Sequence, residues 1–254
     1  MAELGHDVIG IDVDQSKIDA LRRGEAPFYE PGLPDLLLSA GETGRLSFST
    51  DIAAVEGCDV HFVAVGTPQL KDSNAADLQF VDAAIDALVP YLRSGNVVAG
   101  KSTVPVGTAA RLEENISPSG AVLAWNPEFL REGWAVKDTL EPDRIVIGLS
   151  QDAAAAQRAD RALREVYYVA LKANTPLVLT DYATSELVKV AANAFLATKI
   201  SFINAMAEIA EVTGADVMQL ADAIGFDGRI GRRFLGAGVG FGGGCLPKDI
   251  RGFI

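Results

Sequence analysis

The feature that most constrains the fold is an alternation of short β-rich runs with amphipathic helical segments over the first two-thirds of the sequence. This order is typical of a parallel sheet covered by helices. Residues 78–92 give the clearest helical pattern, with apolar residues at helical spacing. Strands are expected at residues 8–12, 59–65, 96–101, 121–125, 144–148 and 176–179. The sequence therefore predicts an α/β fold built on a parallel sheet.

A different pattern follows this alternation. Residues 181–213 are typical of one long helix that ends at Gly214, a residue suited to a left-handed cap. Such a helix would be roughly 45–50 Å long, at a rise of 1.5 Å per residue. It exceeds the depth of one sheet layer, so we expect it to link domains or form a subunit interface. A shorter helix over 215–224 and a glycine-rich stretch over 225–244 come next. We therefore predict a sheet domain, 1–180, and a helical domain, 181–254.

Composition excludes several functional classes. The formal net charge of −12 argues against binding to nucleic acid or to an anionic membrane, because both need a cationic face. Two cysteines, Cys58 and Cys245, are too few for a disulfide scaffold and suit a reducing compartment. The sequence shows no signal-peptide pattern, and its most apolar long stretch, 187–212, is interrupted by Lys, Asn and Glu. We expect a soluble cytoplasmic protein.

Both ends of the sequence look cut. In a dinucleotide-binding unit, an acidic residue after the second strand lies about 20 residues beyond a G-x-G-x-x-G fingerprint. Counting back from Asp12, that fingerprint would precede residue 1. Residues 1–5 read as the last turn of a helix with its glycine cap, and the chain stops nine residues after Cys245. We expect a Rossmann-like domain without its first strand, in a protein that is a fragment.

Polar residues follow several of the expected strands, where ligands bind in open α/β sheets. Asp12 could accept hydrogen bonds from a cofactor ribose or cap the helix that starts near Gln15. Lys17 could contact the cofactor, although a solvated lysine is the simpler interpretation. Thr67 and Thr103 lie in two loops that each end in proline. One such loop is an ordinary turn, whereas two in equivalent positions favour a site.

Two pairs of polar residues are spaced four apart. Glu128 and Glu132 would share a face on a helical turn, where one carboxyl could gain a general-acid or general-base pKa. A solvated surface turn is the alternative. Lys189 and Asn193 share a face of the long helix, with Asn204 near the same stripe. A Lys-x-x-x-Asn pair can stabilise an alkoxide as hydride leaves, and a polar stripe at a helix contact is the alternative.

The strongest signal lies around Cys245. Six glycines between residues 236 and 244 precede this cysteine, and Lys248 and Asp249 follow it. The glycines allow the backbone to approach a ligand closely, and a nearby cation favours a thiolate. Cys58 is expected to be an ordinary buried cysteine. We therefore interpret Cys245 as a functional nucleophile.

Together these segments resemble the UDP-glucose/GDP-mannose dehydrogenase family, in family order and over essentially the whole chain. The matching segments are Gly66-Thr67-Pro68, KSTVPVG at 101–107, NPEFLREG at 126–133, ELVKVAAN at 186–193 and GFGGGCLPKD at 240–249. The resemblance implies that a sugar C6 alcohol is oxidised to a carboxylate while two NAD are consumed. It also implies a homodimer formed through the long central helix, and a UDP-binding domain that would follow residue 254.

The resemblance assigns roles by motif position. Cys245 would be the nucleophile that carries a thiohemiacetal and then a thioester, while Lys189 and Asn193 stabilise the oxyanion. Thr103 and Asp249 would hold a water for proton transfer, Glu128 would assist thioester hydrolysis, and Glu132 would lie near the cofactor and the active centre. The implied NAD contacts are Asp12, Lys17, Thr67, Thr103, Glu132 and Lys248. The implied sugar-nucleotide contacts are Phe129, Leu130, Arg131, Lys189, Phe234, Leu235, Gly236, Ala237, Gly238 and Gly242.

Three alternatives stay open. Within the family, the segments 132–136 and 234–238 favour the UDP-glucose branch over the GDP-mannose and UDP-N-acetylmannosamine branches. A single-step 3-hydroxyacid dehydrogenase also uses a Lys-x-x-x-Asn pair, although it needs no nucleophilic cysteine. A noncatalytic remnant that only dimerises through residues 181–213 is the alternative outside enzymes.

Overall fold

The computed structural model describes residues 1–244 and 246–252. The chain forms two compact units. Unit 1 comprises Met1–Thr67 and Leu78–Glu186, and unit 2 comprises Pro68–Asp77 and Leu187–Ile254. The division expected at residue 180 lies close to the end of unit 1.

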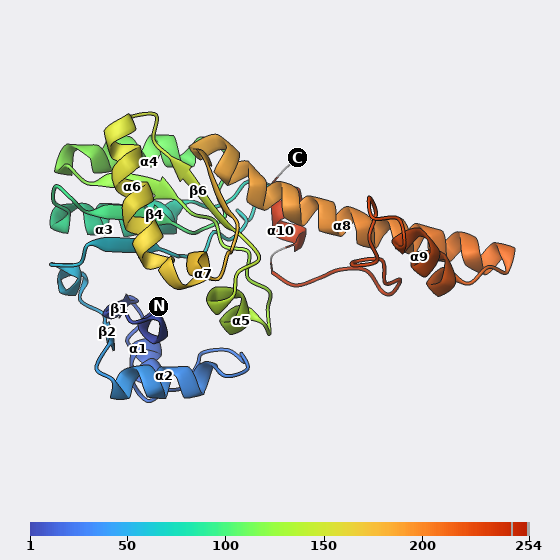
Figure 1. Ribbon diagram of the computed structural model, residues 1–254, viewed down its shortest axis with the longest axis horizontal. Coiled ribbons are helices and arrows are strands. Elements are labelled where there is room, and N and C mark those ends of the chain that lie inside the picture. Colours follow the sequence, from blue (N-terminus) through green and yellow to red (C-terminus); the bar gives the residue numbers. More distant parts are fainter. Residues whose placement is uncertain (245, 253–254) are drawn as a thin grey trace. The chain divides into compact units, whose positions relative to one another are not determined.

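Unit 1 contains two β-sheets within its described residues (Figure 1). In the smaller sheet, β1 (Val8–Ile11) pairs in parallel with β2 (Leu46–Ser49). The larger sheet has the strand order β3-β4-β5-β6-β7. Its strands are β3 (Val60–Val63), β4 (Val97–Gly100), β5 (Val122–Trp125), β6 (Ile145–Leu149) and β7 (Leu177–Asp181). The α/β fold predicted from the sequence is confirmed.

Helices alternate with these strands along unit 1. Several begin where an aspartate side chain accepts hydrogen bonds from backbone N–H groups of the first turn, as Asp14 and Asp152 do. The α-helices are α1 (Gln15–Arg22), α2 (Leu33–Glu42), α3 (Gln79–Leu88), α4 (Thr108–Ile116), α5 (Ala135–Leu140), α6 (Ala153–Val166) and α7 (Tyr168–Lys172). Four short 3-10 helices also lie in the described part of unit 1, at Ala2–Leu4, Ile52–Val55, Val89–Tyr91 and Ser117–Ser119.

The central strands β4 and β5 of the larger sheet are buried on both faces. Val98 and Leu123 point into one apolar cluster, with Ile85 of α3 and Leu112 of α4. The alternate strand residues Val97, Ala99, Val122 and Ala124 point into a second cluster, with Leu163 of α6. All four residues of β4 and all four of β5 are buried. This explains why both strands read as continuous apolar runs in the sequence.

Two features of the sheets differ from the sequence-based expectation. The short strand β2 was not predicted, because Leu46-Ser47-Phe48-Ser49 is half polar and lies at a sheet edge. The pairing of β5 with β6 is antiparallel, whereas the other strand pairs within the described residues are parallel. Only Ala124 and Trp125 of β5 take part in this pairing. Strand direction is not encoded in the local pattern of apolar residues.

The long helix predicted over residues 181–213 is confirmed as α8 (Tyr182–Thr213). It begins where Asp181 accepts hydrogen bonds from the backbone N–H and the hydroxyl of Thr184. Gly214 ends it with φ of 75°, and Ala215 N–H donates to the Ala210 carbonyl, as in a Schellman cap. Its 32 residues include neither proline nor glycine, so nothing in the backbone interrupts it.

Two shorter helices, α9 (Val217–Gly225) and α10 (Leu246–Arg251), follow in unit 2. A small apolar cluster joins Ile203 of α8, Ala221 of α9 and Leu235. Much of α8 is nevertheless exposed, including Phe195 at 66% and Ile209 at 55%. Within unit 2, α9 and the loop that follows it cover only part of the α8 surface.

Candidate active site

Three loops of unit 1 lie at one edge of its larger sheet. They follow β3, β4 and β5, which run parallel, so their carboxyl ends meet at the same edge. The end of β4 is fixed by Gly100, where an added Cβ would lie 2.1 Å from the Trp125 ring. Only glycine allows this close approach. The first two loops carry Thr67 and Thr103.

The Thr67 and Thr103 loops, which the sequence places after successive strands, are in contact. The Thr67 hydroxyl donates a hydrogen bond of 2.8 Å to the Thr103 carbonyl oxygen. Ser102 makes the corresponding link, because its hydroxyl donates to the Val65 carbonyl at 2.7 Å. Thr67 is buried, whereas Thr103 is half-buried. The hydroxyl groups of Thr67 and Ser102 thus connect the backbones of the two loops.

A lysine next to these loops has a strongly perturbed environment. Lys101 Nζ donates to Asn126 Oδ1 at 3.0 Å and lies 3.2 Å from the Tyr167 hydroxyl. It also lies 5.7 Å from the centroid of the Phe62 ring. Burial lowers the pKa of Lys101 to about 8, against the attraction of Glu128. Asn126 in turn donates from Nδ2 to the Val146 carbonyl at 2.8 Å, so the cluster joins the ends of several strands.

The third loop carries Glu128 and Glu132, and it is not helical. Helix α5 begins only at Ala135, so the expectation that these two carboxylates share a helical face is wrong. Glu128 accepts a hydrogen bond of 2.6 Å from the backbone N–H of Leu130, which turns the chain locally. Pro127 favours an extended backbone at Asn126, which explains the absence of a helix there. The half-buried Glu128 and the exposed Glu132 therefore lie in different environments.

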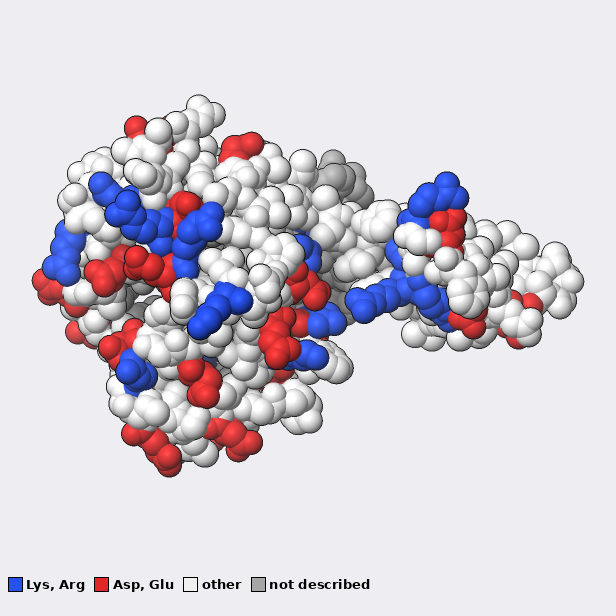
Figure 2. All heavy atoms as spheres, in the orientation of Figure 1, with Lys and Arg blue, Asp and Glu red and all other residues white. Residues whose placement is uncertain are grey.

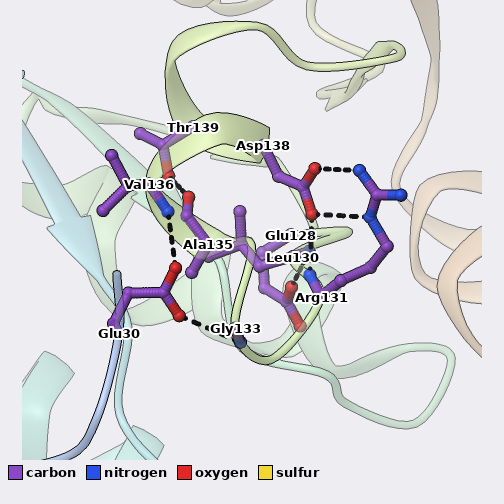
Figure 3. Close-up of polar contacts among 9 residues, drawn as sticks. All are labelled: Glu30, Glu128, Leu130, Arg131, Gly133, Ala135, Val136, Asp138 and Thr139. Carbon is purple, nitrogen blue, oxygen red and sulfur yellow. Dashed lines mark hydrogen bonds and ion pairs between the residues drawn. The ribbon is translucent and has the colours of Figure 1, made fainter. Parts of the chain in front are cut away.

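Two acids outside this pair hold the loop from opposite sides (Figure 3). Asp138 accepts hydrogen bonds from the backbone N–H of Arg131 and from its guanidinium. Glu30 accepts from the backbone N–H groups of Gly133 at 3.0 Å and Val136 at 3.3 Å. Arg131, an implied sugar-nucleotide contact, is thus engaged by Asp138. The Phe129 ring lies 3.8 Å from the guanidinium carbon of Arg144.

Asp12 follows the carboxyl end of β1. Its Oδ1 accepts from the backbone N–H of Asp14, and its Oδ2 lies 3.0 Å from Lys17 Nζ. The hydrogen bond from Asp14, followed by that from Lys17, holds the pKa of Asp12 below its usual value. Lys17 is therefore ion-paired rather than simply solvated. The side chain of Asp12 remains 33% exposed, which leaves a carboxylate oxygen accessible to a ribose. Asp14, not Asp12, caps α1.

In unit 2, two predicted site residues from distant parts of the sequence lie in contact. Asn193 of α8 donates from Nδ2 to Asp249 Oδ2 of α10 at 2.6 Å. Lys248 Nζ lies 3.0 Å from Asp249 Oδ1 in an ion pair that lacks hydrogen-bond alignment. Asp249 and Lys189 are both 5% exposed. The family resemblance gave Asn193 and Asp249 different roles, and the structure shows that their side chains are in contact.

Cys245, the predicted nucleophile, lies outside the described residues. Helix α10 begins at the residue that follows it. Cys58 is half-buried rather than fully buried, because it lies in the loop before β3. No group of three or more His, Cys, Asp or Glu side chains within the described residues is placed to hold a metal ion.

The predicted substrate loop, residues 234–238, is anchored on α8 and α9. Asn204 accepts a hydrogen bond of 2.9 Å from the Gly238 N–H, and Lys199 Nζ donates to the carbonyls of Ile230 and Gly231. Leu235 is 1% exposed within the apolar cluster of unit 2, so its side chain serves the fold. Phe234 is 42% exposed and has φ of 64°, a strained value for a side chain of this size. Gly236, Gly238 and Gly242 are exposed, and Ala237 is half-buried.

Comparison with known proteins decides the family. Residues 1–170 match the NAD binding domain of the UDP-glucose/GDP-mannose dehydrogenase family, and residues 183–254 match its central domain. The chain belongs to this family. Since the first match is to an NAD binding domain, the cofactor of this part of the family is NAD.

Members of the UDP-glucose/GDP-mannose dehydrogenase family align with essentially the whole chain. A UDP-glucose 6-dehydrogenase of Rhizobium meliloti is 48% identical over 100% of this chain and 58% of its own length. A UDP-glucose dehydrogenase structure from Pyrobaculum islandicum has a TM-score of 0.91 and 42% identity, covering 99% of this chain and 58% of that one. A GDP-mannose dehydrogenase from Pseudomonas aeruginosa has a TM-score of 0.81 and 33% identity, with coverage of 98% and 58%. The chain thus spans little more than half the length of these relatives.

Several residues that shape the site were not predicted from the sequence. Glu30 and Glu186 are buried acids whose oxygens accept from backbone N–H groups of distant loops. Tyr167 completes the contacts of Lys101. Among these residues, Glu30 alone has a local signal in the sequence, because it precedes Pro31-Gly32 at the start of a helical pattern. Its partner could not be inferred from that position.

Proposed function

We propose that this chain is the NAD-binding and central part of a UDP-glucose 6-dehydrogenase. The observation that carries the proposal is the hydrogen bond between Asn193 and Asp249, because it joins the polar stripe of α8 to the segment that follows Cys245. Alignment of the whole chain with a UDP-glucose 6-dehydrogenase at 48% identity supports the choice of substrate. Functionally, we divide the chain into a cofactor part, 1–180, and a part that carries the nucleophile, 181–254.

When bound, NAD would supply the hydride acceptor for each of the two proposed oxidation steps. Thr103 and Asp249 hold a water that takes the proton of the C6 hydroxyl as the aldehyde forms. The Cys245 thiolate then adds to the carbonyl carbon, and Lys189 and Asn193 stabilise the resulting oxyanion of the thiohemiacetal. Loss of the second hydride leaves a thioester. Water, assisted by Glu128, adds to this thioester, the thiolate leaves, and the carboxylate is released.

Exposure, or a position at the carboxyl end of a strand, supports most of the proposed NAD contacts. Asp12 keeps an exposed carboxylate at the end of β1, as recognition of a ribose requires. Thr67 and Thr103 lie at the sheet edge where cofactors bind in open α/β sheets. Glu132 is exposed, Lys17 is ion-paired to Asp12, and Lys248 belongs to unit 2.

We also propose a homodimer formed through α8. Phe195, Phe202 and Ile209 are exposed by 66%, 47% and 55%, and their spacing of seven residues places them along one side of the helix. Such a stripe is typical of a helix that packs against another helix. Replacing Phe202 by Glu should convert the dimer to a monomer in sedimentation velocity. Phe80, which is 48% exposed in unit 1, gives the matched control Phe80→Glu. A dimer that survives Phe202→Glu at micromolar concentration would contradict this interface.

The same helix bears on localisation, for which we propose the cytoplasm. Among the described residues, α8 is the one helix long and apolar enough to cross a membrane by length and composition. Its residues Asn193, Lys199 and Asn204 each contact polar groups elsewhere in unit 2, which favours a helix in water. Acidic and basic side chains are interspersed on the face shown in Figure 2, without one continuous basic surface. This distribution and the net charge of −12 argue against a nucleic-acid partner.

Calorimetric titration with NAD and with UDP-glucose, followed by an assay for NADH, tests the proposal. We expect saturable binding of both ligands and NADH formation that depends on UDP-glucose. Binding of neither ligand would favour the noncatalytic remnant instead. Preference for GDP-mannose or UDP-N-acetylmannosamine in the same assay would assign the chain to another branch of its family.

A further inference from the structure

The carboxylate of Glu132 lies on a tight turn whose conformation is set by its neighbours. Trp134 N–H donates to the Arg131 carbonyl at 2.9 Å, which closes a β-turn over residues 131–134. Gly133 has φ of 79° at the third position of this turn, a conformation that favours glycine. An added Cβ at Gly133 would meet no atom within 4 Å, so the backbone conformation alone requires glycine there.

Glu30 holds this turn from a distant part of the sequence. It is 4% exposed, and its two oxygens accept from the N–H groups of Gly133 and Val136 (Figure 3). Gly133 is 103 residues away along the chain. Glu30 itself is fixed at the start of α2, where its carbonyl accepts from the Leu33 N–H at 3.2 Å. The side chain therefore connects the segment before α2 to the loop that follows β5.

A carboxylate suits this position for a definite chemical reason. Both partners are donors, and a carboxylate offers two acceptor oxygens. A glutamine could accept from one N–H but would direct its own NH₂ group toward the other. On the opposite side of the turn, Asp138 fixes Arg131 through its backbone and its guanidinium. Glu132 lies between Arg131 and Gly133, whose backbone N–H groups are held by Asp138 and Glu30, so the conformation of the turn sets the direction of its side chain.

We propose that Glu30 is a positioning residue that fixes the turn over residues 131–134 and thereby sets the direction in which the Glu132 side chain leaves that turn. This inference rests on the proposed function, in which Glu132 lies near NAD and the active centre. Glu30 does not contact substrate or cofactor in this account. Its buried carboxylate acts through the N–H groups of Gly133 and Val136, and so through the turn.

Glu30→Gln and Gly133→Ala test the proposal from the two sides of the same hydrogen bond. Each variant should lower kcat for NADH formation by between about ten- and a hundredfold, since ångström-scale misplacement has effects of this size. The KM for UDP-glucose should stay within about twofold, because Asp138 still holds Arg131 through its backbone and its guanidinium in these variants. Matched controls are Glu42→Gln at the exposed end of α2 and Gly44→Ala. Gly44 also has a left-handed φ, of 72°, and open space around its Cα. Both controls should keep the parent kcat.

Hydrogen exchange separates failure of this inference from failure of the proposed function. At least one of the amides of Gly133 and Val136 should exchange at least about tenfold faster in Glu30→Gln than in Glu42→Gln, because a glutamine can accept from only one of them. Unchanged exchange, or a parent-like kcat in Glu30→Gln and Gly133→Ala, would overturn the positioning role. If the parent protein oxidises no nucleotide sugar at all, the proposed function fails. The positioning role then falls with it, even where the exchange result shows that Glu30 holds the turn.

Discussion

Asn193 and Asp249 are joined by a hydrogen bond of 2.6 Å although they lie 56 residues apart in the sequence. The contact sets α10 against α8, and it places a buried carboxylate beside the polar stripe of the long helix. Helix α10 begins at Leu246, the residue that follows Cys245. The Asn193–Asp249 contact is therefore the structural basis on which the proposed chemistry of unit 2 depends.

A double-mutant cycle measures that contact. Asn193→Ala, Asp249→Ala and the double variant should show a coupling of about 1.5–3 kcal/mol in the free energy of unfolding, as for a hydrogen bond to a charged group. The exposed pair Gln15 and Asp19, at 2.7 Å, is the control and should couple by about 0.5 kcal/mol or less. Additive effects of Asn193→Ala and Asp249→Ala would show that the two side chains do not interact in solution.

Asp12 should determine the preference for NAD over NADP. Its pKa is held below its usual value, chiefly by the Asp14 backbone N–H, so the carboxylate is ionised at neutral pH and repels a 2′-phosphate. Asp12→Asn should reduce the ratio of NAD to NADP affinity by about tenfold or more, since one charge–charge contact is worth about 1–4 kcal/mol. Calorimetric titration with both cofactors measures this ratio, with the exposed Asp35→Asn as control. An unchanged ratio would place the ribose elsewhere.

Glu186 should contribute to stability by joining α8 to the start of α4. It is 2% exposed and accepts from the backbone N–H groups of Gly107 and Ala109, each at 2.7 Å. Glu186→Gln replaces one acceptor by a donor that faces an N–H, which should cost about 1–3 kcal/mol of unfolding free energy. Chemical denaturation provides the measurement, and Glu114→Gln on the exposed side of α4 is the control. Equal stability of these two variants would rule out a stabilising contribution from the Glu186 hydrogen bonds to Gly107 and Ala109.

Lys101 should make stability depend on pH in an unusual direction. Burial lowers its pKa to about 8, whereas an unfolded chain keeps the ordinary value of 10.5. Between pH 8 and pH 10.5 the unfolded state binds more protons than the folded state, so the free energy of unfolding rises with pH. The stability that comes from a neutral Lys101 is therefore present above pH 10.5 and is lost as the pH falls through 8. Relative to Lys101→Met, the parent should gain at most about 3.5 kcal/mol over this window, at about 1.4 kcal/mol per pKa unit. Urea titrations at several pH values measure it.

The exposed Lys71→Met is the control for that experiment, because its side chain is exposed both in the parent structure and in any unfolded chain. Its stability difference from the parent should not change between pH 8 and 10.5. A Lys101→Met difference that is equally flat would show that the Lys101 ammonium is not desolvated in solution.

The elements that the sequence predicted are those with strong local patterns. The strands β4 and β5 are buried on both faces and read as apolar runs, while α8 lacks proline and glycine and ends at Gly214. The strand β2 was missed because two of its four residues are serine. The sequence did not predict that Glu128 lies outside a helix. The four-residue spacing of Glu128 and Glu132 indicated a helical turn, whereas Asn126-Pro127 is only a weak local signal against one.

The contacts that organise the site could not be predicted in the same way. Glu30 bonds to Gly133, Lys101 to Tyr167, and Glu186 to Gly107 across 103, 66 and 79 residues. Each contact depends on which loops the sheet order brings together, and no local spacing encodes it. The motifs identified Asn193 and Asp249 as separate site residues, and their hydrogen bond was not predicted.

The most direct test of the central claim is the number of NADH molecules formed for each molecule of UDP-glucose consumed. The proposed two-step oxidation through Cys245 predicts two, with the uronic acid as product and no release of acid from Cys245→Ser. A ratio of one, or acid release at the parent rate from Cys245→Ser, would contradict the account.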